Sequence, residues 1–442
     1  MLADKIKDKS VRVGIIGIGY VGLPLAHSFA EAGVCTIGFD LSRNKVDSIN
    51  KGASYIPDVP AEAVKELVLN KKTLSASTDF SGLRSMDVVF ICVPTPFDKH
   101  KAPDLECVRS AAESTARTLQ KGQLIVLQST TYPGTTEEVV RPILEKTGLK
   151  AGQDFYLAFS PERIDPGNKK FNAHNTPKVV GGIDRESTKL TAELFRLFID
   201  ADKVHEVSCP KTAEMCKILE NTFRAVNIAL VNEMLMLSER MGIDIWEVIE
   251  AAGTKPFGFM PFYPGPGVGG HCIAVDPFYL SWKAREYDFF TRFIELAADT
   301  NMNMPYYVID RLRRLLSASG QNISGAKILV LGAAFKKDID DCRNSVALYL
   351  IKLLEDAGAE VIYNDPYVPK FKFEHELYNT DKNPREYVSQ ELTPGVLSGA
   401  DCVLVAVAHS AYDFDFILKN AKLVFDLVNG AKGRRAENLH KL

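Results

Sequence analysis

The stretch VRVGIIGIGYVGLPLAHSFAEAG, residues 11–33, decides the fold of the first part of the chain. Residues 11–17 form a short apolar run that predicts a strand, and the glycines after it lead into a helix that ends at Gly33. CTIGFD, residues 35–40, predicts a second strand that ends on Asp40. A strand, a glycine turn, a helix and another strand begin a βαβ unit with a parallel sheet.

The same alternation continues outward, with further strands expected at residues 86–94 and 123–130. It starts again at Lys327 with KILVLGAAF, followed by a helix closing at Gly358 and a strand ending at Asp365. Residues 401–409 and 423–430 predict two more strands.

Between these two halves, residues 211–242 show apolar residues at helical spacing and contain no proline or glycine before the end. They predict one helix more than ~40 Å long at ~1.5 Å per residue. We therefore expect an α/β protein with two Rossmann-like parallel-sheet domains joined by a helical middle domain with a long central helix. The expected boundaries are 1–205, 206–320 and 321–442.

Composition excludes several classes of protein. The 442 residues are 46% hydrophobic and 25% charged, which is ordinary for a globular protein with more than one core. The net charge is −3 and the basic residues form no block, so no nucleic-acid partner is expected. No apolar run is long enough for a transmembrane helix, and the polar start leads straight into a strand without a signal peptide, so no membrane contact is expected.

The eight cysteines are scattered and form no CxxC pair. This spacing argues against a zinc site and against a disulfide framework, so no metal is expected. Most of the cysteines, including Cys35, are expected to be buried and inert, in a reduced compartment. A cytoplasmic location is the default expectation.

GIGYVG, residues 17–22, is a GxGxxG motif between a predicted strand and a predicted helix. With Asp40 at the end of the next strand, it has the context of a dinucleotide-binding fingerprint. Gly17 would allow the tight turn, Gly19 would let the backbone approach a pyrophosphate, and Gly22 would let helix and strand pack closely. The Asp40 carboxylate would bind both ribose hydroxyls and repel a 2′-phosphate, so NAD is expected rather than NADP.

GPGVGGHCIAVDP, residues 265–277, places Cys272 on a glycine-rich loop and Asp276 four residues later. Core packing does not call for this arrangement. The chain resembles the UDP-glucose/GDP-mannose dehydrogenase family from about Val11 to Asn429. The resemblance lies in GIGYVGLPLA, ICVPTP, QSTTYPGTTE, SPERIDPGN, KILENTF, GPGVGGHCIAVDPFYL and LGAAFKKDIDDCRNS.

The resemblance implies that a primary alcohol at sugar C6 is oxidised twice, to a carboxylate, with NAD as the oxidant. Cys272 would bind the intermediate aldehyde as a thiohemiacetal, which becomes a thioester that water hydrolyses. Asp276 would position or activate that water. Lys217 and Asn221, four residues apart on the long helix, match the family's pair that stabilises the oxyanion and holds water.

The resemblance also implies the residues around the two ligands. Thr130 and Glu162 match the family's active-site threonine and first glutamate. The expected cofactor contacts are Gly17, Gly19, Tyr20, Val21, Gly22, Asp40, Lys45, Pro94, Thr95, Thr130 and Arg343. The expected substrate contacts are Glu162, Arg163, Lys217, Asn221, Lys255, Phe262, Tyr263, Gly267, Gly269 and Lys336. The second α/β domain would hold the nucleotide half of the substrate, and a homodimer through the long helix is expected.

Two departures separate this chain from members that act on UDP-glucose. Val275 stands where those members have lysine, and Pro166 stands where they have a second glutamate, with Asp165 beside it. Neither Asp165 nor His271 is given a role. TKPFGFMPFYPGPG, residues 254–267, resembles the branch acting on UDP-N-acetylglucosamine, which is the favoured substrate. UDP-N-acetylmannosamine, whose branch shares GPGVGGHCIAVDP, and UDP-glucose are the alternatives.

Two other classes of function compete with this one. A two-electron NAD-dependent hydroxyacid dehydrogenase also has a Rossmann domain and a helical partner, but it needs neither a thiol nor a third domain. A non-catalytic nucleotide sensor would be favoured if Cys272, Lys217 or Asp276 were missing, and all three are present.

Overall fold

The computed structural model describes residues 1–98, 101–165, 168, 170–270, 273–373 and 385–442. The chain folds into two compact units. One comprises Met1–Glu220 with Arg285–Tyr287, and the other comprises Asn221–Ala284 with Asp288–Leu442. The three-part division expected from the sequence stays a prediction.

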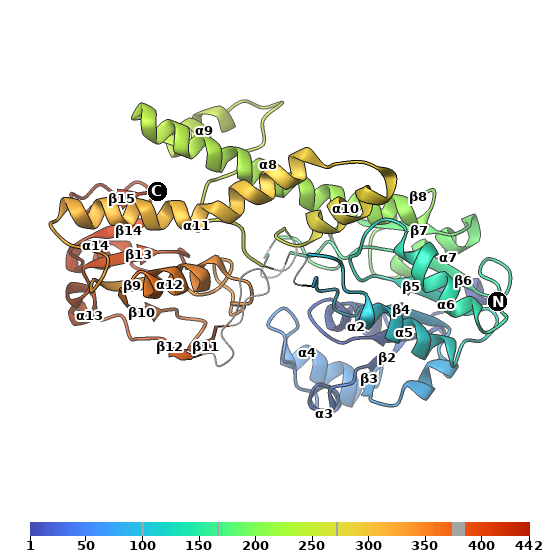
Figure 1. The fold of residues 1–442 in the computed structure, drawn as a ribbon. Helices are drawn as coiled ribbons and strands as arrows, with labels where there is room; N and C mark the ends of the chain where they lie inside the picture. The colour runs from blue at the N-terminus through green and yellow to red at the C-terminus, as the bar shows by residue number, and fades with distance from the viewer. Residues whose placement is uncertain (99–100, 166–167, 169, 271–272, 374–384) are drawn as a thin grey trace. The chain divides into compact units, whose positions relative to one another are not determined.

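The first unit contains an eight-stranded sheet in the order β3-β2-β1-β4-β5-β6-β7-β8 (Figure 1). All neighbouring strands are parallel except β6 and β7, so the predicted parallel sheet is confirmed. The strands are β1 (Arg12–Ile16), β2 (Cys35–Phe39), β3 (Leu74–Ser77), β4 (Val88–Ile91), β5 (Leu124–Leu127), β6 (Tyr156–Phe159), β7 (Lys178–Gly182) and β8 (Val204–Val207).

Helices cover both faces of this sheet. On one face, Ile6 of α1 (Leu2–Lys7), Phe29 of α2 (Gly22–Glu31) and Phe195 of α7 (Arg185–Phe195) share one apolar cluster with β1, β4 and β5. Since Val88 and Phe90 face this cluster, the other β4 side chains face the opposite side, where α5 (Glu106–Ala116) contacts β4. The unit also contains the helices α3 (Arg43–Asn50), α4 (Ala61–Lys65) and α6 (Arg141–Glu145).

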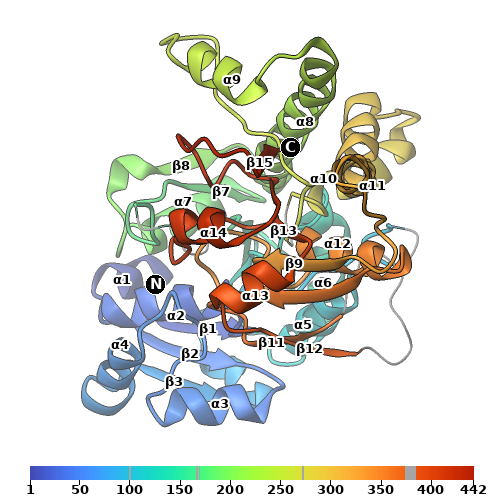
Figure 2. The ribbon, with the colours of Figure 1, turned by 90° about the vertical axis from the view of Figure 1, so that its left-hand side faces the viewer.

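The second unit contains a five-stranded, fully parallel sheet in the order β10-β9-β13-β14-β15. Helices α11 and α12 pack on one face, and α13 and α14 on the other (Figure 2). The sheet strands are β9 (Lys327–Leu331), β10 (Glu360–Asn364), β13 (Cys402–Val405), β14 (Val424–Asp426) and β15 (Leu439–Lys441). The sheet helices are α12 (Val346–Asp356), α13 (Pro394–Gly399) and α14 (Phe414–Asn420), and β11 (Lys370–Lys372) pairs with β12 (Glu386–Val388).

The predicted long helix is confirmed as α8 (Pro210–Met241), with 32 residues. It is followed by α9 (Ile245–Gly253), α10 (Asp276–Ala284) and α11 (Arg292–Ala318), which contains Pro305. Within the residues that the structure describes, none of the helices combines the length and the apolar character needed to span a membrane.

The expectation that most cysteines are buried is wrong for the described residues. Only Cys92 and Cys402 are buried among the seven cysteines described, whereas Cys35 and Cys107 are exposed. Cys35 is the first residue of β2, at the end of the strand, where solvent reaches its side chain. Cys107 lies beside the buried stripe of α5, not on it.

Candidate active site

The glycine turn after β1 has the geometry that its sequence predicts. Gly17 has φ +87°, and a Cβ at Gly22 would lie 1.9 Å from the Gly17 carbonyl oxygen, so neither position accepts a side chain. A Cβ at Gly19 would meet nothing within 4 Å. The backbone at Gly19 is therefore open to a ligand at the start of α2, and this opening fits the pyrophosphate of NAD.

Asp40 is fixed at the end of β2 by its own loop. Its carboxylate accepts hydrogen bonds from the backbone N–H of Ile18 (3.1 Å) and of Ser42 (2.9 Å), and the Lys45 ammonium lies 3.2 Å away. A carboxylate has about four acceptor positions, and three are used. One ribose hydroxyl fits directly, whereas binding of both would require Lys45 to swing away.

Further predicted residues follow the ends of β4, β5 and β6. Because these strands are parallel to β1, Pro94, Thr95, Thr130 and Glu162 lie at the same edge of the sheet as the glycine turn. The Thr95 hydroxyl donates to the Thr130 carbonyl oxygen at 2.7 Å, which ties the loops after β4 and β5 together. The structure thus brings this part of the predicted site together within one unit.

The Glu162 carboxylate is buried and its acceptor positions are occupied. One oxygen accepts from the Gln128 amide and the Lys178 ammonium, both at 2.8 Å. The other accepts from the backbone N–H of Arg163 (2.7 Å) and of Ile164 (2.9 Å). Burial by itself would raise the pKa of Glu162, but the positive charge of Lys178 and the donated hydrogen bonds outweigh burial and lower that pKa.

Arg163 is engaged by protein groups in the structure. Its guanidinium lies 2.6 Å from the Glu220 carboxylate of α8 and donates to the Pro177 carbonyl oxygen at 2.9 Å. Arg163 therefore closes the loop between β6 and β7 onto α8. Asp165 accepts a long hydrogen bond of 3.4 Å from Asn168 within the same loop.

In the second unit, α8 and α10 bring together two of the predicted catalytic residues. The Asn221 amide donates to the Asp276 carboxylate at 2.5 Å, and Arg224 donates to the Asn221 amide oxygen at 2.7 Å. Asn221 and Asp276 are 1% and 4% exposed, so the contact is sheltered from water. Lys217, one helical turn before Asn221, is 8% exposed.

Arg224 was not predicted from the sequence, although its i+3 spacing from Asn221 places both on one face of the helix. It fixes the orientation of the amide. A flipped amide would place its oxygen against the Asp276 carboxylate and its NH2 group against the guanidinium, and neither pair could form a hydrogen bond. Cys272 and His271 lie outside the described residues.

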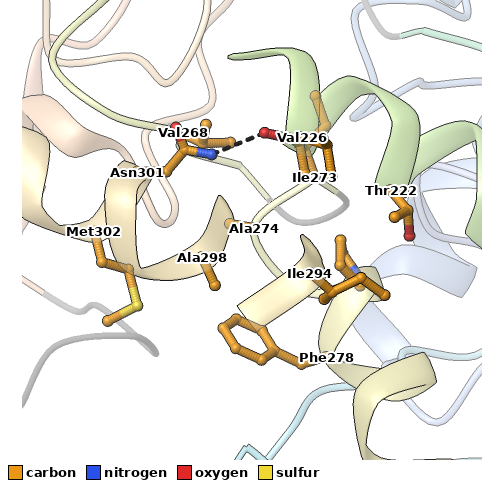
Figure 3. A pocket seen from close by; sticks show the side chains of 12 residues that line it. Thr222, Val226, Val268, Ile273, Ala274, Phe278, Ile294, Ala298, Asn301 and Met302 are labelled. Carbon is orange, nitrogen blue, oxygen red and sulfur yellow. Dashed lines mark hydrogen bonds between the residues drawn. The ribbon is translucent and has the colours of Figure 1, made fainter. Parts of the chain in front are cut away.

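The start of the loop that carries Cys272 is anchored by two buried amides. The Gly265 N–H donates to the Asn232 amide oxygen, and Asn232 donates to the Asn301 amide oxygen, both at 3.0 Å. Asn301 in turn donates to the Ala225 carbonyl oxygen of α8 at 3.0 Å (Figure 3). The loop is therefore tied to α8 and α11, by contacts that the sequence did not reveal.

The glycines of this loop are needed for close packing. A Cβ at Gly267 would lie 3.1 Å from the Asn301 carbonyl oxygen, to which Pro305 has no N–H to donate. A Cβ at Gly269 would lie 2.9 Å from the Asn344 carbonyl oxygen. These contacts account for glycine at both positions without a ligand, and the predicted substrate contacts there stay predictions.

A small cavity lies against the segment after Cys272. It is lined mainly by apolar side chains, among them Val268, Ile273, Phe278, Ile294 and Met302 (Figure 3). Its volume of about 30 Å³ is far below the ~300 Å³ of a small ligand pocket. A cavity of this volume is too small to hold a sugar.

Three predicted substrate contacts lie around the long loop before Gly265. Phe262 packs edge-to-face on Phe223, with ring centroids 5.6 Å apart. Tyr263 stacks on Trp246 at 6.0 Å and is half exposed, and Lys255 is exposed. These ring contacts pack the loop against α8 and α9.

Asp365 directly follows β10 just as Asp40 directly follows β2, but it has a different role. It is 3% exposed and accepts hydrogen bonds from the N–H groups of Ala333 (2.6 Å) and Ala334 (3.1 Å). His409 Nε2 lies 3.0 Å from the same carboxylate. Burial would raise the pKa of Asp365, but these hydrogen bonds lower it. The carboxylate shapes the turn after β9 from inside.

That turn carries the two predicted ligand contacts of this unit. Lys336 is half-buried in the loop between β9 and α12. Arg343 forms a two-pronged pair with Asp341 at 2.9 and 2.6 Å, and its side chain is 57% exposed. The ligand-binding role of each stays a prediction.

Comparison with known proteins matches the chain over most of its length. Residues 11–199, 211–303 and 329–432 match the NAD binding, central and UDP binding domains of the UDP-glucose/GDP-mannose dehydrogenase family. The UDP-N-acetyl-D-glucosamine 6-dehydrogenase of Pseudomonas aeruginosa is 37% identical, over 91% of this chain and 92% of the relative. The UDP-N-acetyl-D-mannosamine dehydrogenase of Pyrococcus horikoshii is 34% identical, over 91% and 90%.

Among solved structures, the UDP-D-ManNAc dehydrogenase of Pyrococcus horikoshii matches with a TM-score of 0.87 and 32% identity. The match covers 98% of this chain and 99% of that one. The predicted family, fold class and cofactor are thereby confirmed. The chain belongs to the UDP-glucose/GDP-mannose dehydrogenase family and is an NAD-dependent UDP-sugar 6-dehydrogenase.

Proposed function

We propose that this enzyme oxidises the C6 alcohol of UDP-N-acetylglucosamine to the uronic acid, in two oxidations at one site. Relatives named for UDP-N-acetyl-D-glucosamine, at 37% and 35% identity, support this substrate. Relatives named for UDP-N-acetyl-D-mannosamine follow at 34%, so that sugar is the second candidate. The segment TKPFGFMPFYPGPG, residues 254–267, favours the first.

The observation that carries the chemical proposal is the buried contact of Asn221 with Asp276. It holds the carboxylate of Asp276, four residues after Cys272 in the sequence, against Asn221, which lies one helical turn after Lys217 on α8. NAD, when bound, accepts hydride. The ammonium of Lys217 would stabilise negative charge on the C6 oxygen, and the amide of Asn221 would hold Asp276 in place.

The Cys272 sulfur would bond to C6 of the intermediate aldehyde, so that the half-oxidised sugar cannot leave. The resulting thiohemiacetal becomes a thioester after the second oxidation. Water then cleaves the C–S bond, with Asp276 as the acceptor of a proton from that water. Thr130 and Glu162 complete the proposed catalytic set at the edge of the first sheet.

Stoichiometry with a panel of UDP-sugars tests this function. Two NADH formed per UDP-N-acetylglucosamine consumed is the expected result, and one NADH per sugar would indicate a simple alcohol dehydrogenase. Faster turnover of UDP-N-acetylmannosamine or UDP-glucose would reassign the substrate. Cys272→Ala should stop uronate formation while NAD still binds, and Cys107→Ala, which removes an exposed thiol of α5, serves as the control.

We also propose a homodimer through α8. Six large apolar side chains of this helix are 40–62% exposed: Met215, Leu219, Phe223, Leu230, Leu237 and Met241. They are separated by 4, 4, 7, 7 and 4 residues, the spacing of a helix seam that packs against another helix. Leu230→Arg should shift the sedimentation coefficient to that of a monomer, and a variant that stays a dimer would exclude this seam. The cytoplasmic location stays a prediction.

A further inference from the structure

Lys178 is a buried cation to which the sequence assigned no role. It is the first residue of β7 and only 1% exposed, and its ammonium lies 2.8 Å from the Glu162 carboxylate. Lysine is almost never fully buried unless it is paired. A buried ion pair is weak support for stability, because removing two charges from water offsets their attraction. The pair therefore calls for another explanation.

The backbone itself creates this pair. Strands β6 and β7 are antiparallel, with Ala158 opposite Gly182 and Phe159 opposite Gly181. Extending this register by three residues places Glu162 opposite Lys178. The two side chains meet where the chain leaves the sheet edge that carries the glycine turn and Thr130, so Lys178 lies beside the proposed site.

Burial raises the pKa of Glu162, and the charge and hydrogen bond of Lys178 are the largest effects that lower it. Of the cationic groups nearby, the Arg163 guanidinium is turned instead to Glu220, at 2.6 Å. On the side of β4, the buried thiol of Cys92 lies 3.8 Å from the Gln128 amide oxygen. Burial, and secondarily the negative charge of Glu162, raises the pKa of the Cys92 thiol, so this neighbour stays neutral.

Glu162 also shapes the loop that follows β6. Its second oxygen accepts hydrogen bonds from the N–H groups of Arg163 and Ile164, so the backbone turns over the carboxylate. If the carboxylate took up a proton, one oxygen would become a donor and would face groups that are donors themselves. At least one of the four contacts would break, and the loop would loosen.

We propose that Lys178 is a positioning residue that keeps Glu162 ionised and thereby holds residues 160–165 in the shape that sugar turnover requires. The inference rests on the proposed function, because the role of this loop in turnover is itself proposed. The Lys178 ammonium contacts Glu162 and lies over the ring of Phe195, and neither residue belongs to the glycine turn or to the loop of Asp40. Its loss should therefore spare NAD binding.

The test measures kcat/KM for UDP-N-acetylglucosamine against pH in Lys178→Met and in Lys178→Gln, which keeps a hydrogen-bond donor without charge. The acidic limb of the profile should move up by about one pH unit or more in both, because burial of Glu162 is no longer opposed. Lys178→Arg should keep the parental limb, and the KM for NAD should change less than about twofold in all three.

An unmoved limb in the neutral variants would overturn the proposal. A limb that moves equally in Lys178→Arg would overturn it as well, because charge would not be the cause. If neither neutral variant folds while Lys178→Arg does, Lys178 is a structural residue and not a positioning one.

A second readout needs no turnover and so separates this inference from the proposed function. Amide hydrogen exchange of the peptide covering residues 160–165 should become faster in Lys178→Gln and in Glu162→Gln. Exchange over residues 11–33 should stay at the parental rate. Unchanged exchange at residues 160–165 would refute the role of Lys178, whatever sugar the enzyme oxidises.

Discussion

Glu214 offers a quantitative test of the electrostatics beneath the site. It lies on α8, three residues before Lys217, and is 1% exposed. Its carboxylate accepts hydrogen bonds from the N–H of Gly134 (2.5 Å) and from the N–H (2.9 Å) and hydroxyl (2.7 Å) of Thr136. Through them Glu214 holds the loop after β5, which carries Thr130, against α8.

Burial raises the pKa of Glu214 from 4.5 to about 7, although the donated hydrogen bonds favour its ionised form. Between these two values the folded protein binds more protons than the unfolded chain, so stability falls as pH rises. The difference between these two pKa values corresponds to about 3 kcal/mol of stability in total, of which about 2.5 kcal/mol is lost between pH 5 and pH 8.

Glu214→Gln removes the titration without changing the size of the side chain. The unfolding free energy of this variant, relative to the parent, should therefore rise by about 2.5 kcal/mol from pH 5 to pH 8. Urea unfolding followed by far-ultraviolet circular dichroism measures it, since both tryptophans belong to the other unit. Glu186→Gln, an exposed carboxylate of α7, is the matched control. Parallel pH curves for parent and Glu214→Gln would refute this account of the buried charge.

Three further substitutions address the two ligand sites. Asp40→Asn should weaken the binding of NAD about tenfold or more and reduce the preference for NAD over NADP, because it removes the charge that orients the ribose. An unchanged NAD/NADP ratio of kcat/KM would contradict this. Gly22→Ala should abolish NAD binding in a calorimetric titration, because its Cβ would lie 1.9 Å from the Gly17 carbonyl oxygen; retained affinity would show that the turn can yield. Arg224→Met should lower kcat about tenfold or more at constant KM for NAD, by freeing the Asn221 amide to rotate; an equal kcat would remove Arg224 from the positioning of Asp276.

Local pattern was sufficient for four of the eight strands of the first sheet and for α8. Apolar runs bounded by turns predicted β1, β2, β4 and β5, and unbroken helical spacing predicted a helix that the structure places at Pro210–Met241. The glycine turn could be predicted from sequence because each of its glycines is required by backbone contacts or conformation within a few residues of its own position.

Contacts between distant segments could not be predicted in this way. The pairing of Glu162 with Lys178 follows from the antiparallel register of β6 and β7, which no single stretch of sequence specifies. The hydrogen bond between Asn232 and Asn301 joins residues 69 positions apart, and each asparagine alone is an ordinary helix residue. Burial of Cys35 was wrongly expected because residues at the end of a strand share the composition of central ones.

Pro305 and Gly267 have a consequence for the natural history of the sequence. The proline leaves the Asn301 carbonyl without its usual partner in α11, and the loop comes close to that oxygen only because position 267 has no side chain. If only one of the two residues were replaced, the structural requirement for the other would be lost. Descendants of a common ancestor are therefore expected to keep both or to replace both, and a collection of natural variants would reveal the two positions drifting in concert.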